Sequence, residues 1–446
     1  MAPSSSSVSE KGLGLKTPNS NLNSDAVPAG AAAAAAAAPG LGRTESLQIL
    51  STFIVFTNTW GFLLTSGVLQ AHYELVLLKD QSSSNISWIS TTCAFLVLSA
   101  GIVTGPLYDR GLYRLLLLAG SVLQVLGLMM LSISTRYYQL FLSHGICIGI
   151  GAGVAFTPSV SAAARSLPHP ATRAKAMGLM ASGSCIGGIV FPLALRALIP
   201  KVGFPWAIRI IAFIILGLYF LSYLVLLRSS AQVQAGSFVR AFFDISSLTD
   251  APFMMLCVAS LFSAMAFYIP LLYLPLLTAI RVPSISTKFS LDLLAILNGA
   301  SAVGRLLAGL IAAVYGPTET VAVSLVAGSV LLFCWMAVDT LAGTLAWVVF
   351  WGMVSGILVT LPGAFIPFFC PSMAVIGTRS GFYWAWVGLG MLIGSPIGGA
   401  IYPLKSSGGG YWHLQVFAGV FMMGAAVLTV YPIVYLQHRN RRAAAS

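Results

Sequence analysis

Long apolar runs separated by short polar stretches fill the chain from about residue 45 onward. A helix needs about 20 residues to cross the roughly 30 Å hydrocarbon core of a bilayer. The pattern predicts twelve membrane-spanning helices, at about residues 47–70, 87–107, 113–133, 138–158, 176–199, 206–227, 252–277, 290–314, 319–338, 343–367, 376–401 and 412–436.

The amino-acid composition excludes most soluble classes of protein. Of the 446 residues, 58% are hydrophobic and 8% are charged, whereas soluble domains carry about 25% charged residues. The net charge of +12 would suggest a nucleic-acid partner in a soluble protein, but here Lys and Arg lie mostly in loops and tails. We therefore expect an all-α membrane protein surrounded by a lipid bilayer, with no nucleic-acid partner.

Sequence motifs of enzymes and of cofactor sites are missing. The chain has no GxxxxGK[ST], no HExxH and no clustered carboxylate pair. Its six cysteines form no CxxC pair and its five histidines are scattered, which argues against a disulfide framework or a metal site. We predict that the protein is not an enzyme and uses no cofactor or metal.

The apolar segments form two sets of six, with polar sequence before, between and after them. Short loops on one side of the predicted membrane hold 14 Lys and Arg against 8 on the other, which predicts cytoplasmic termini and, we expect, a place in the plasma membrane. The sequon at Asn85 would then face outward as a candidate glycosylation site, although its position against the second helix disfavours modification. The predicted units are a disordered cytoplasmic tail (1–44), a six-helix bundle (45–228), a cytoplasmic linker (229–250), a second six-helix bundle (251–436) and a C-terminal tail (437–446).

An internal repeat relates the two sets of helices. Gly183–Pro192 in the fifth segment and Gly394–Pro403 in the eleventh are identical at six of ten positions. Ala119–Leu123 in the third segment has the same sequence as Ala327–Leu331 in the ninth. An offset of six helices keeps two repeats parallel, which is the architecture of major facilitator transporters.

The loop after the second segment supports this architecture. It places an acid and bases between glycines, in the order Gly105, Asp109, Arg110, Gly111 and Arg114, and resembles the major facilitator signature between helices two and three. Glycine permits close helix approach. We predict that the acid and bases pair across the cytoplasmic helix ends and act as a conformational latch.

A series of short motifs runs through the predicted spans, at Asn58–Gly61, Gly67–Glu74, Ile86–Ser90, Ala176–Leu179, Gly183–Pro192, Leu297–Arg305 and Gly377–Gly381. In their order and spacing, over residues 50–436, the chain most resembles fungal relatives of monocarboxylate transporters. The resemblance implies a secondary transporter that moves a monocarboxylate or related organic acid by alternating access, with protons as a candidate coupling ion. Two departures weaken the expectation of proton coupling, because Ser66 and Ser301 stand where animal members carry a lysine and an aspartate.

Arg305 is the leading candidate for substrate binding. It lies about nine residues from the cytoplasmic end of its segment, roughly 13 Å at 1.5 Å per residue, so it should face an interior cavity and be paired. A carboxylate substrate suits its guanidinium, and the resemblance implies the same role; the alternative is a structural arginine bonded to carbonyls or to a neighbouring helix. Further candidates for lining the cavity are Asn298, Asn58, Thr65, Gln70, Tyr268, Tyr383, Trp384 and Trp386.

Two other functions stay open at this point. An apolar cavity with aromatic walls would suit efflux of a neutral, largely apolar secondary metabolite, with Arg305 reduced to a structural role. A sensor that signals through the N-terminal tail is a further alternative, supported only by the length of that tail.

Overall fold

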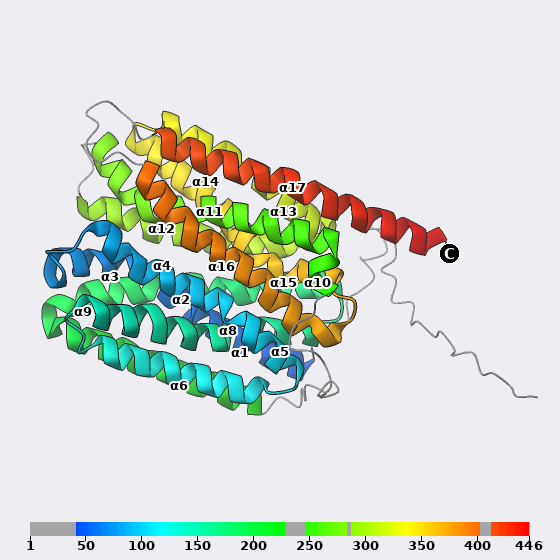
Figure 1. Ribbon diagram of the computed structural model, residues 1–446, viewed down its shortest axis with the longest axis horizontal. Coiled ribbons are helices and arrows are strands. Elements are labelled where there is room, and N and C mark those ends of the chain that lie inside the picture. Colours follow the sequence, from blue (N-terminus) through cyan, green and yellow to red (C-terminus); the bar gives the residue numbers. More distant parts are fainter. Residues whose placement is uncertain (1–41, 228–245, 283–286, 402–411, 446) are drawn as a thin grey trace, which may run out of the picture.

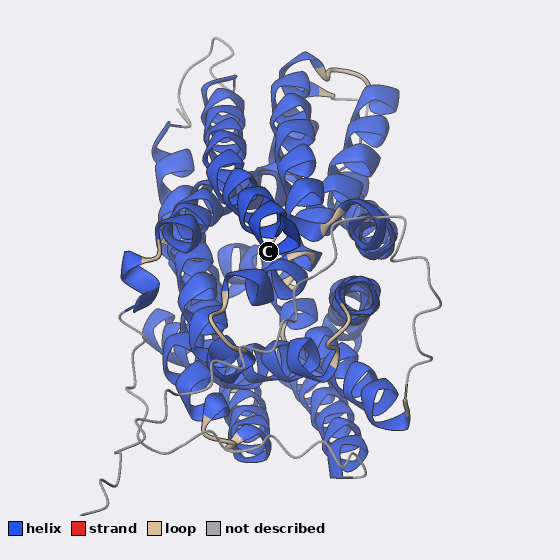
Figure 2. Cartoon of the chain, turned by 90° about the vertical axis from the view of Figure 1, so that its right-hand side faces the viewer, coloured by secondary structure: helices blue, strands red, loops and turns tan. Residues whose placement is uncertain are grey.

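The computed structural model of the protein describes residues 42–227, 246–282, 287–401 and 412–445. All regular secondary structure within these ranges is helical, as Figure 2 shows. The predicted N-terminal tail as far as residue 41 and the predicted linker as far as residue 245 lie outside the described residues.

Residues 43–227 form the N-terminal half of the molecule, drawn in blue to green in Figure 1. Several predicted helices consist of consecutive helical pieces. The elements are α1 (Arg43–Asn58), α2 (Trp60–Leu63), α3 (Ser66–His72), the π-helix η2 (Tyr73–Leu77), α4 (Ser83–Ser99), α5 (Gly101–Asp109), α6 (Tyr113–Leu131), α7 (Tyr137–Leu140), the π-helix η3 (Phe141–Ile148), α8 (Gly149–Ser166) and α9 (Pro170–Leu227).

Residues 246–445 form the C-terminal half, drawn in green to red on the other side of the molecule in Figure 1. Its last helix continues to Ala445, so the described part of the predicted tail at 437–446 is helical. The elements are α10 (Ser246–Thr249), α11 (Ala251–Arg281), α12 (Thr287–Tyr315), α13 (Pro317–Cys334), η4 (Trp335–Ala337), α14 (Leu341–Thr360), α15 (Pro362–Phe365), η5 (Ile366–Phe369), η6 (Met373–Val375), α16 (Ile376–Ile401) and α17 (Trp412–Ala445).

Helix α9 contains two of the predicted spans. Its 58 residues are broken at Gly203, which has φ 77° and ψ 162°, a conformation open almost only to glycine. Contacts with the first span show that the chain folds back at this break. Gly61 packs against Gly187, before the break. The side chain of Asn58, less than one turn from Gly61, bonds to Ile215, after the break. The sequence placed this break correctly, between its segments 176–199 and 206–227.

The described residues account for the twelve predicted spans. Ten helical stretches are long and apolar enough to cross a membrane. One of them is α9, which supplies two spans, and α16 adds a further apolar helix of 26 residues. The first stretch starts at Arg43, so its helix begins inside the segment that we predicted to be a disordered tail.

Two pairs of helices join the halves through closely approaching glycines. Gly101 and Gly105 of α5 pack against the backbone at Gly381 and Gly377 of α16. In the second pair, α9 meets α12 where Gly178 packs against Gly309. Small residues let helix backbones approach closely in a membrane, so these contacts set how near the two halves can lie.

Candidate functional site

A cavity lies between α2 of the N-terminal half and the helices of the C-terminal half. The space between its lining atoms, counted together with the space open to the outside at its mouth, is about 610 Å³. Only Trp60 comes from the N-terminal half among the described residues that line it. The others are Leu256, Ala259, Ser260, Ser263, Ala264 and Phe267 of α11, Val321 and Leu325 of α13, Leu358 and Val359 of α14, Pro362 and Phe365 of α15, Tyr383, Trp384, Val387 and Met391 of α16, and Thr429 of α17.

The wall of this cavity contains no charged side chain among the described residues. Three of its hydroxyl groups are used inside the protein: Ser260 and Thr429 donate to the carbonyls of Cys257 and Ala425, both at 2.7 Å. Ser263 lies 3.6 Å from the sulfur of Met422. The cavity therefore offers apolar and aromatic surface, without a cation for an anionic ligand.

Aromatic rings from both halves meet at the cavity. Trp60 and Trp384 each pack edge-to-face with Phe156 of α8, with ring centroids 6.1 Å and 5.3 Å apart. Tyr383 continues this cluster to Phe365, with centroids 5.7 Å apart. Tyr383 and Trp384 are thus the predicted residues that line the described cavity, and Trp60 is a lining residue that the sequence prediction missed.

The position of Trp60 depends on local breaks in the first span. The hydroxyl of Thr59 donates to the Val55 carbonyl at 2.7 Å, and the hydroxyl of Thr65 donates to the Phe62 carbonyl. Such bonds from Ser and Thr compete with the helical backbone and bend helices. The signal was visible in the sequence as Asn58-Thr59-Trp60-Gly61, which the prediction used only for the family resemblance.

Arg305 lies at the contact between the halves and not in the cavity wall. Its Nη1 donates to the Ala181 carbonyl at 2.6 Å and to the Ser184 hydroxyl, both on α9. Its Nε donates to Ser301, one turn earlier on α12, at 3.4 Å. The guanidinium is 3% exposed. This is the structural arrangement that the sequence had left as the alternative to binding a carboxylate.

The other predicted substrate residues also lie away from the described cavity. Asn58 belongs to a network inside the N-terminal half. Its side-chain Nδ2 donates to the Ile215 carbonyl at 3.2 Å, and its backbone carbonyl accepts from Gln124 Nε2 at 2.8 Å. Asn298 is buried on α12 near Gly188 of α9, and Tyr268 is buried on α11. Their role in substrate binding stays a prediction.

At the predicted cytoplasmic end, Asp109 joins the halves. Its carboxylate accepts bonds from the backbone N–H groups of Gly377 and Thr378, at 2.9 and 2.8 Å, and from the Thr378 hydroxyl at 2.7 Å. These donors stand at the start of α16, where the free N–H groups of a helix bind anions well. Asp109, the acid of the predicted latch, is thus bonded to the N-terminus of α16 in the other half of the molecule.

The remaining residues of the predicted latch shape this contact or lie at its edge. Gly105 meets the Gly377 carbonyl so closely that any side chain would collide with it. Gly111 has φ 88° and turns the chain into α6, while Arg110 ends α5 and Arg114 is exposed on α6. The predicted glycosylation residue, Asn85, is exposed in the first turn of α4.

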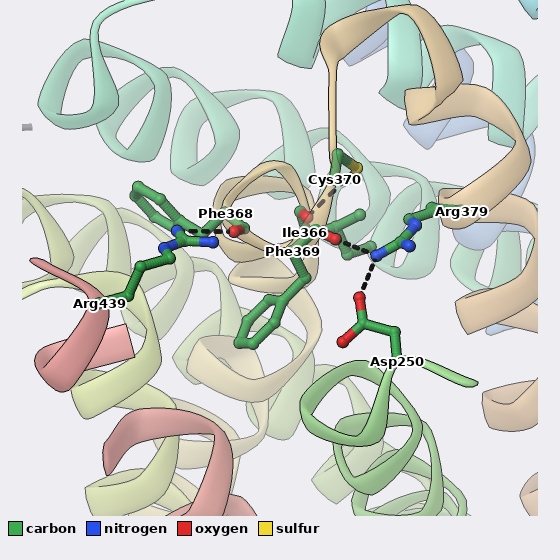
Figure 3. Close-up of polar contacts among 7 residues, drawn as sticks. All are labelled: Asp250, Ile366, Phe368, Phe369, Cys370, Arg379 and Arg439. Carbon is green, nitrogen blue, oxygen red and sulfur yellow. Dashed lines mark hydrogen bonds and ion pairs between the residues drawn. The ribbon is translucent and has the colours of Figure 1, made fainter. Parts of the chain in front are cut away.

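A second polar cluster secures the chain between α15 and α16, as Figure 3 shows. Arg379 of α16 pairs with Asp250 at 2.6 Å and donates to the Phe369 carbonyl. Arg439 of α17 donates to the Phe368 carbonyl at 3.0 Å. These bonds hold the segment that follows Phe365, a residue of the cavity wall. Sequence analysis included Arg379 within the motif Gly377–Gly381 and assigned it no partner.

Comparison with known proteins agrees with this architecture. The family model described as Major Facilitator Superfamily matches residues 48–395. The chain belongs to this superfamily. It is therefore a multi-pass membrane transporter for small molecules, as the sequence predicted.

Its relatives are fungal MFS-type transporters. The chain is 37% identical over 390 residues to the MFS-type transporter dbaD of Emericella nidulans, covering 87% of this chain and 85% of the relative. It is 32% identical over 407 residues to the Fujikurins efflux protein of Gibberella fujikuroi, covering 90% and 85%. It is also 32% identical over 372 residues to the Aspyridones efflux protein apdF of Emericella nidulans, covering 83% and 74%. These relatives do not specifically support the expected resemblance to monocarboxylate transporters.

A solved structure shares the fold. The human organic anion transporter MFSD10 (TETRAN) matches with a TM-score of 0.64 and 16% identity, covering 87% of this chain and 99% of that chain. At this identity the likeness supports the fold alone.

Proposed function

We propose that the protein exports a neutral, largely apolar secondary metabolite by alternating access. The observation that carries the proposal is the cavity, whose described wall is aromatic and aliphatic and has no charged side chain. Two of the relatives are named as efflux proteins, which favours export over uptake.

An organic acid is the second candidate substrate. It is favoured by the resemblance to monocarboxylate transporters and by the buried guanidinium of Arg305. However, burying a carboxylate without a partner is costly, and the described cavity wall offers it no cation. The bonds of Arg305 to Ala181 and Ser184 give that cation a structural use, so the neutral cargo fits the geometry better.

The contacts between the halves suit rocking around a central site. Asp109 and the start of α16 would separate when the cytoplasmic end opens and admits cargo. At the other end, Arg196 of α9 pairs with Asp292 of α12 at 2.6 Å. These two contacts lie at opposite ends of the predicted membrane-spanning region, so opening one end while the other stays closed exposes the cavity to one side at a time.

Location and coupling are further parts of the proposal. We place the protein in the plasma membrane with both termini in the cytoplasm, on the distribution of Lys and Arg.

Protons are the proposed coupling ion, and the buried His144, whose Nδ1 lies 3.1 Å from the Tyr73 hydroxyl, is a titratable group inside the N-terminal half. Collapse of the pH gradient should stop export if protons drive it, and continued export would exclude them.

The test is metabolite profiling of cells and medium from a strain without the gene, complemented with matched variants. Val321 lines the cavity on α13, whereas Val323 of the same helix is 70% exposed. Val321→Phe should narrow the cavity and obstruct its cargo, which leaves a neutral compound trapped in the cells, as the deletion does. Wild type and Val323→Phe should restore its release.

Three outcomes would contradict the proposal. A trapped compound that is an organic acid would favour the second candidate, and carboxylates should then compete for its transport. A compound left unused in the medium of the deletion strain would indicate uptake. Equal export by Val321→Phe and wild type would remove the described cavity from the transport route.

A further inference from the structure

Two hydrogen-bond donors in the cavity wall have no partner inside the protein. The indole nitrogens of Trp60 and Trp384 are buried and donate no hydrogen bond within the described residues. The side chains are 2% and 4% exposed. Both residues line the cavity. Because the two nitrogens are covered in this conformation, a molecule in the cavity reaches these donors when the lining side chains shift.

Another buried tryptophan of the protein does have a partner. Trp347 of α14, for comparison, donates from its indole nitrogen to the Leu331 carbonyl at 2.6 Å. A buried tryptophan N–H generally finds a partner, because an unmade hydrogen bond costs free energy away from water. The edge-to-face contacts of Trp60 and Trp384 with Phe156 allow at most weak N–H···π contacts. Both donors therefore remain available to a stronger acceptor.

Their chemistry selects the complementary group on the cargo. An indole N–H only donates, so its partner must accept. A ketone or quinone carbonyl oxygen accepts two hydrogen bonds and donates none, and it carries no charge that would need a cation. The aromatic rings at the cavity suit the aryl groups that commonly flank such carbonyls.

We propose that the exported metabolite carries a neutral carbonyl oxygen, of the aryl ketone or quinone type, which accepts hydrogen bonds from the indole N–H groups of Trp60 and Trp384. The inference rests on the proposed function and narrows its substrate class. Trp60 belongs to α2 in the N-terminal half and Trp384 to α16 in the C-terminal half. A carbonyl held by both would tie cargo binding to the approach of the two halves.

The experiment measures binding of three related probes to the purified full-length protein in lipid nanodiscs. Benzophenone has the carbonyl between two aryl rings, diphenylmethane lacks it, and para-benzoylbenzoate adds a carboxylate. One net hydrogen bond changes affinity by about fivefold, so benzophenone should bind wild type about 30-fold more tightly than diphenylmethane. Benzophenone should also bind more tightly than para-benzoylbenzoate.

Three variants assign the difference to the two indoles. In Trp60→Phe and in Trp384→Phe, the preference for benzophenone over diphenylmethane should fall to about fivefold. Trp386→Phe is the matched control, because Trp386 lies on the same helix outside the described cavity wall, and it should keep the full preference. The carbonyl stretch of carbon-13-labelled benzophenone tests the same hydrogen bonds in the wild-type protein without any substitution, because each accepted hydrogen bond lowers the stretching frequency.

The outcomes separate this inference from the function it rests on. Equal binding of benzophenone and diphenylmethane to wild type, or an unshifted carbonyl stretch, would overturn the inference and leave export of neutral metabolites standing. A preference that survives in both tryptophan variants would do the same. Tighter binding of para-benzoylbenzoate would overturn the proposed neutral cargo itself. Failure of all three probes to bind would overturn the inference for aryl ketones.

Discussion

The contact between Asp109 and the start of α16 makes the strongest prediction about the transport cycle. Asp109 accepts three hydrogen bonds from Gly377 and Thr378. The substitution Asp109→Asn keeps the size of the side chain but replaces one acceptor oxygen with an NH₂ group. That NH₂ would face donors, so at least one charge-assisted bond is lost.

The structure sets the size of the effect. Hydrogen bonds to a charged group contribute about 1.5–3 kcal/mol each, so losing one of them should cost about 1.5–3 kcal/mol. The population with a closed cytoplasmic end would then fall about 10- to 160-fold relative to the open population. We expect slower turnover with little change in the affinity for cargo, because Asp109 does not line the described cavity.

The assay follows the opening of the cytoplasmic end directly. Spin labels would replace Leu115 of α6 and Tyr315 of α12, which are exposed at the predicted cytoplasmic ends of the two halves and lie outside the predicted latch. The label distances of Asp109→Asn should shift toward the longer, open population. Asp80→Asn is the control, since it makes the same chemical change at an exposed residue. Unchanged distances and export in Asp109→Asn would refute the latch.

Further predictions concern the remaining contacts between the halves. Arg305→Ala should lower the unfolding temperature and slow export, because its bonds to α9 are lost. The response of export to competing carboxylates should stay unchanged. If a carboxylate that inhibits wild type no longer inhibited the variant, Arg305 would regain a role in substrate binding. Gly381→Ala should sharply reduce export, since the new methyl would collide with the Gly101 backbone, whereas Gly217→Ala, which meets no neighbour, should be neutral; matching export of the two would contradict this packing. The Arg196–Asp292 pair is partly exposed and should contribute only about 0.2–1 kcal/mol, so single charge reversals should alter export by less than about fivefold and the double swap should recover it. Epitope tags at both ends should be accessible only from the cytoplasm, and an accessible C-terminus outside would contradict an even number of spans.

The sequence by itself determined that this is a membrane protein, how many spans it has and that its two halves are parallel repeats. These properties follow from hydropathy over about 20 residues and from repeated motifs, both of which are local or periodic features of the chain. The same reasoning selected Asp109 as a candidate latch residue and Trp384 as a candidate for the cavity wall. It also identified Arg305 as a residue that needs a partner inside the membrane.

Only the tertiary structure decided which partners these residues have. Asp109 meets Thr378, which is 269 positions away in the chain, and Arg305 meets Ala181 and Ser184 on a helix of the other half. Apolar spans carry weak amphipathic signals, because membrane-facing and protein-facing sides are both hydrophobic, so the sequence does not show which face of a helix lines a cavity. Packing at closely approaching glycines sets those faces, and with them the placement of Trp60 beside Trp384 around Phe156.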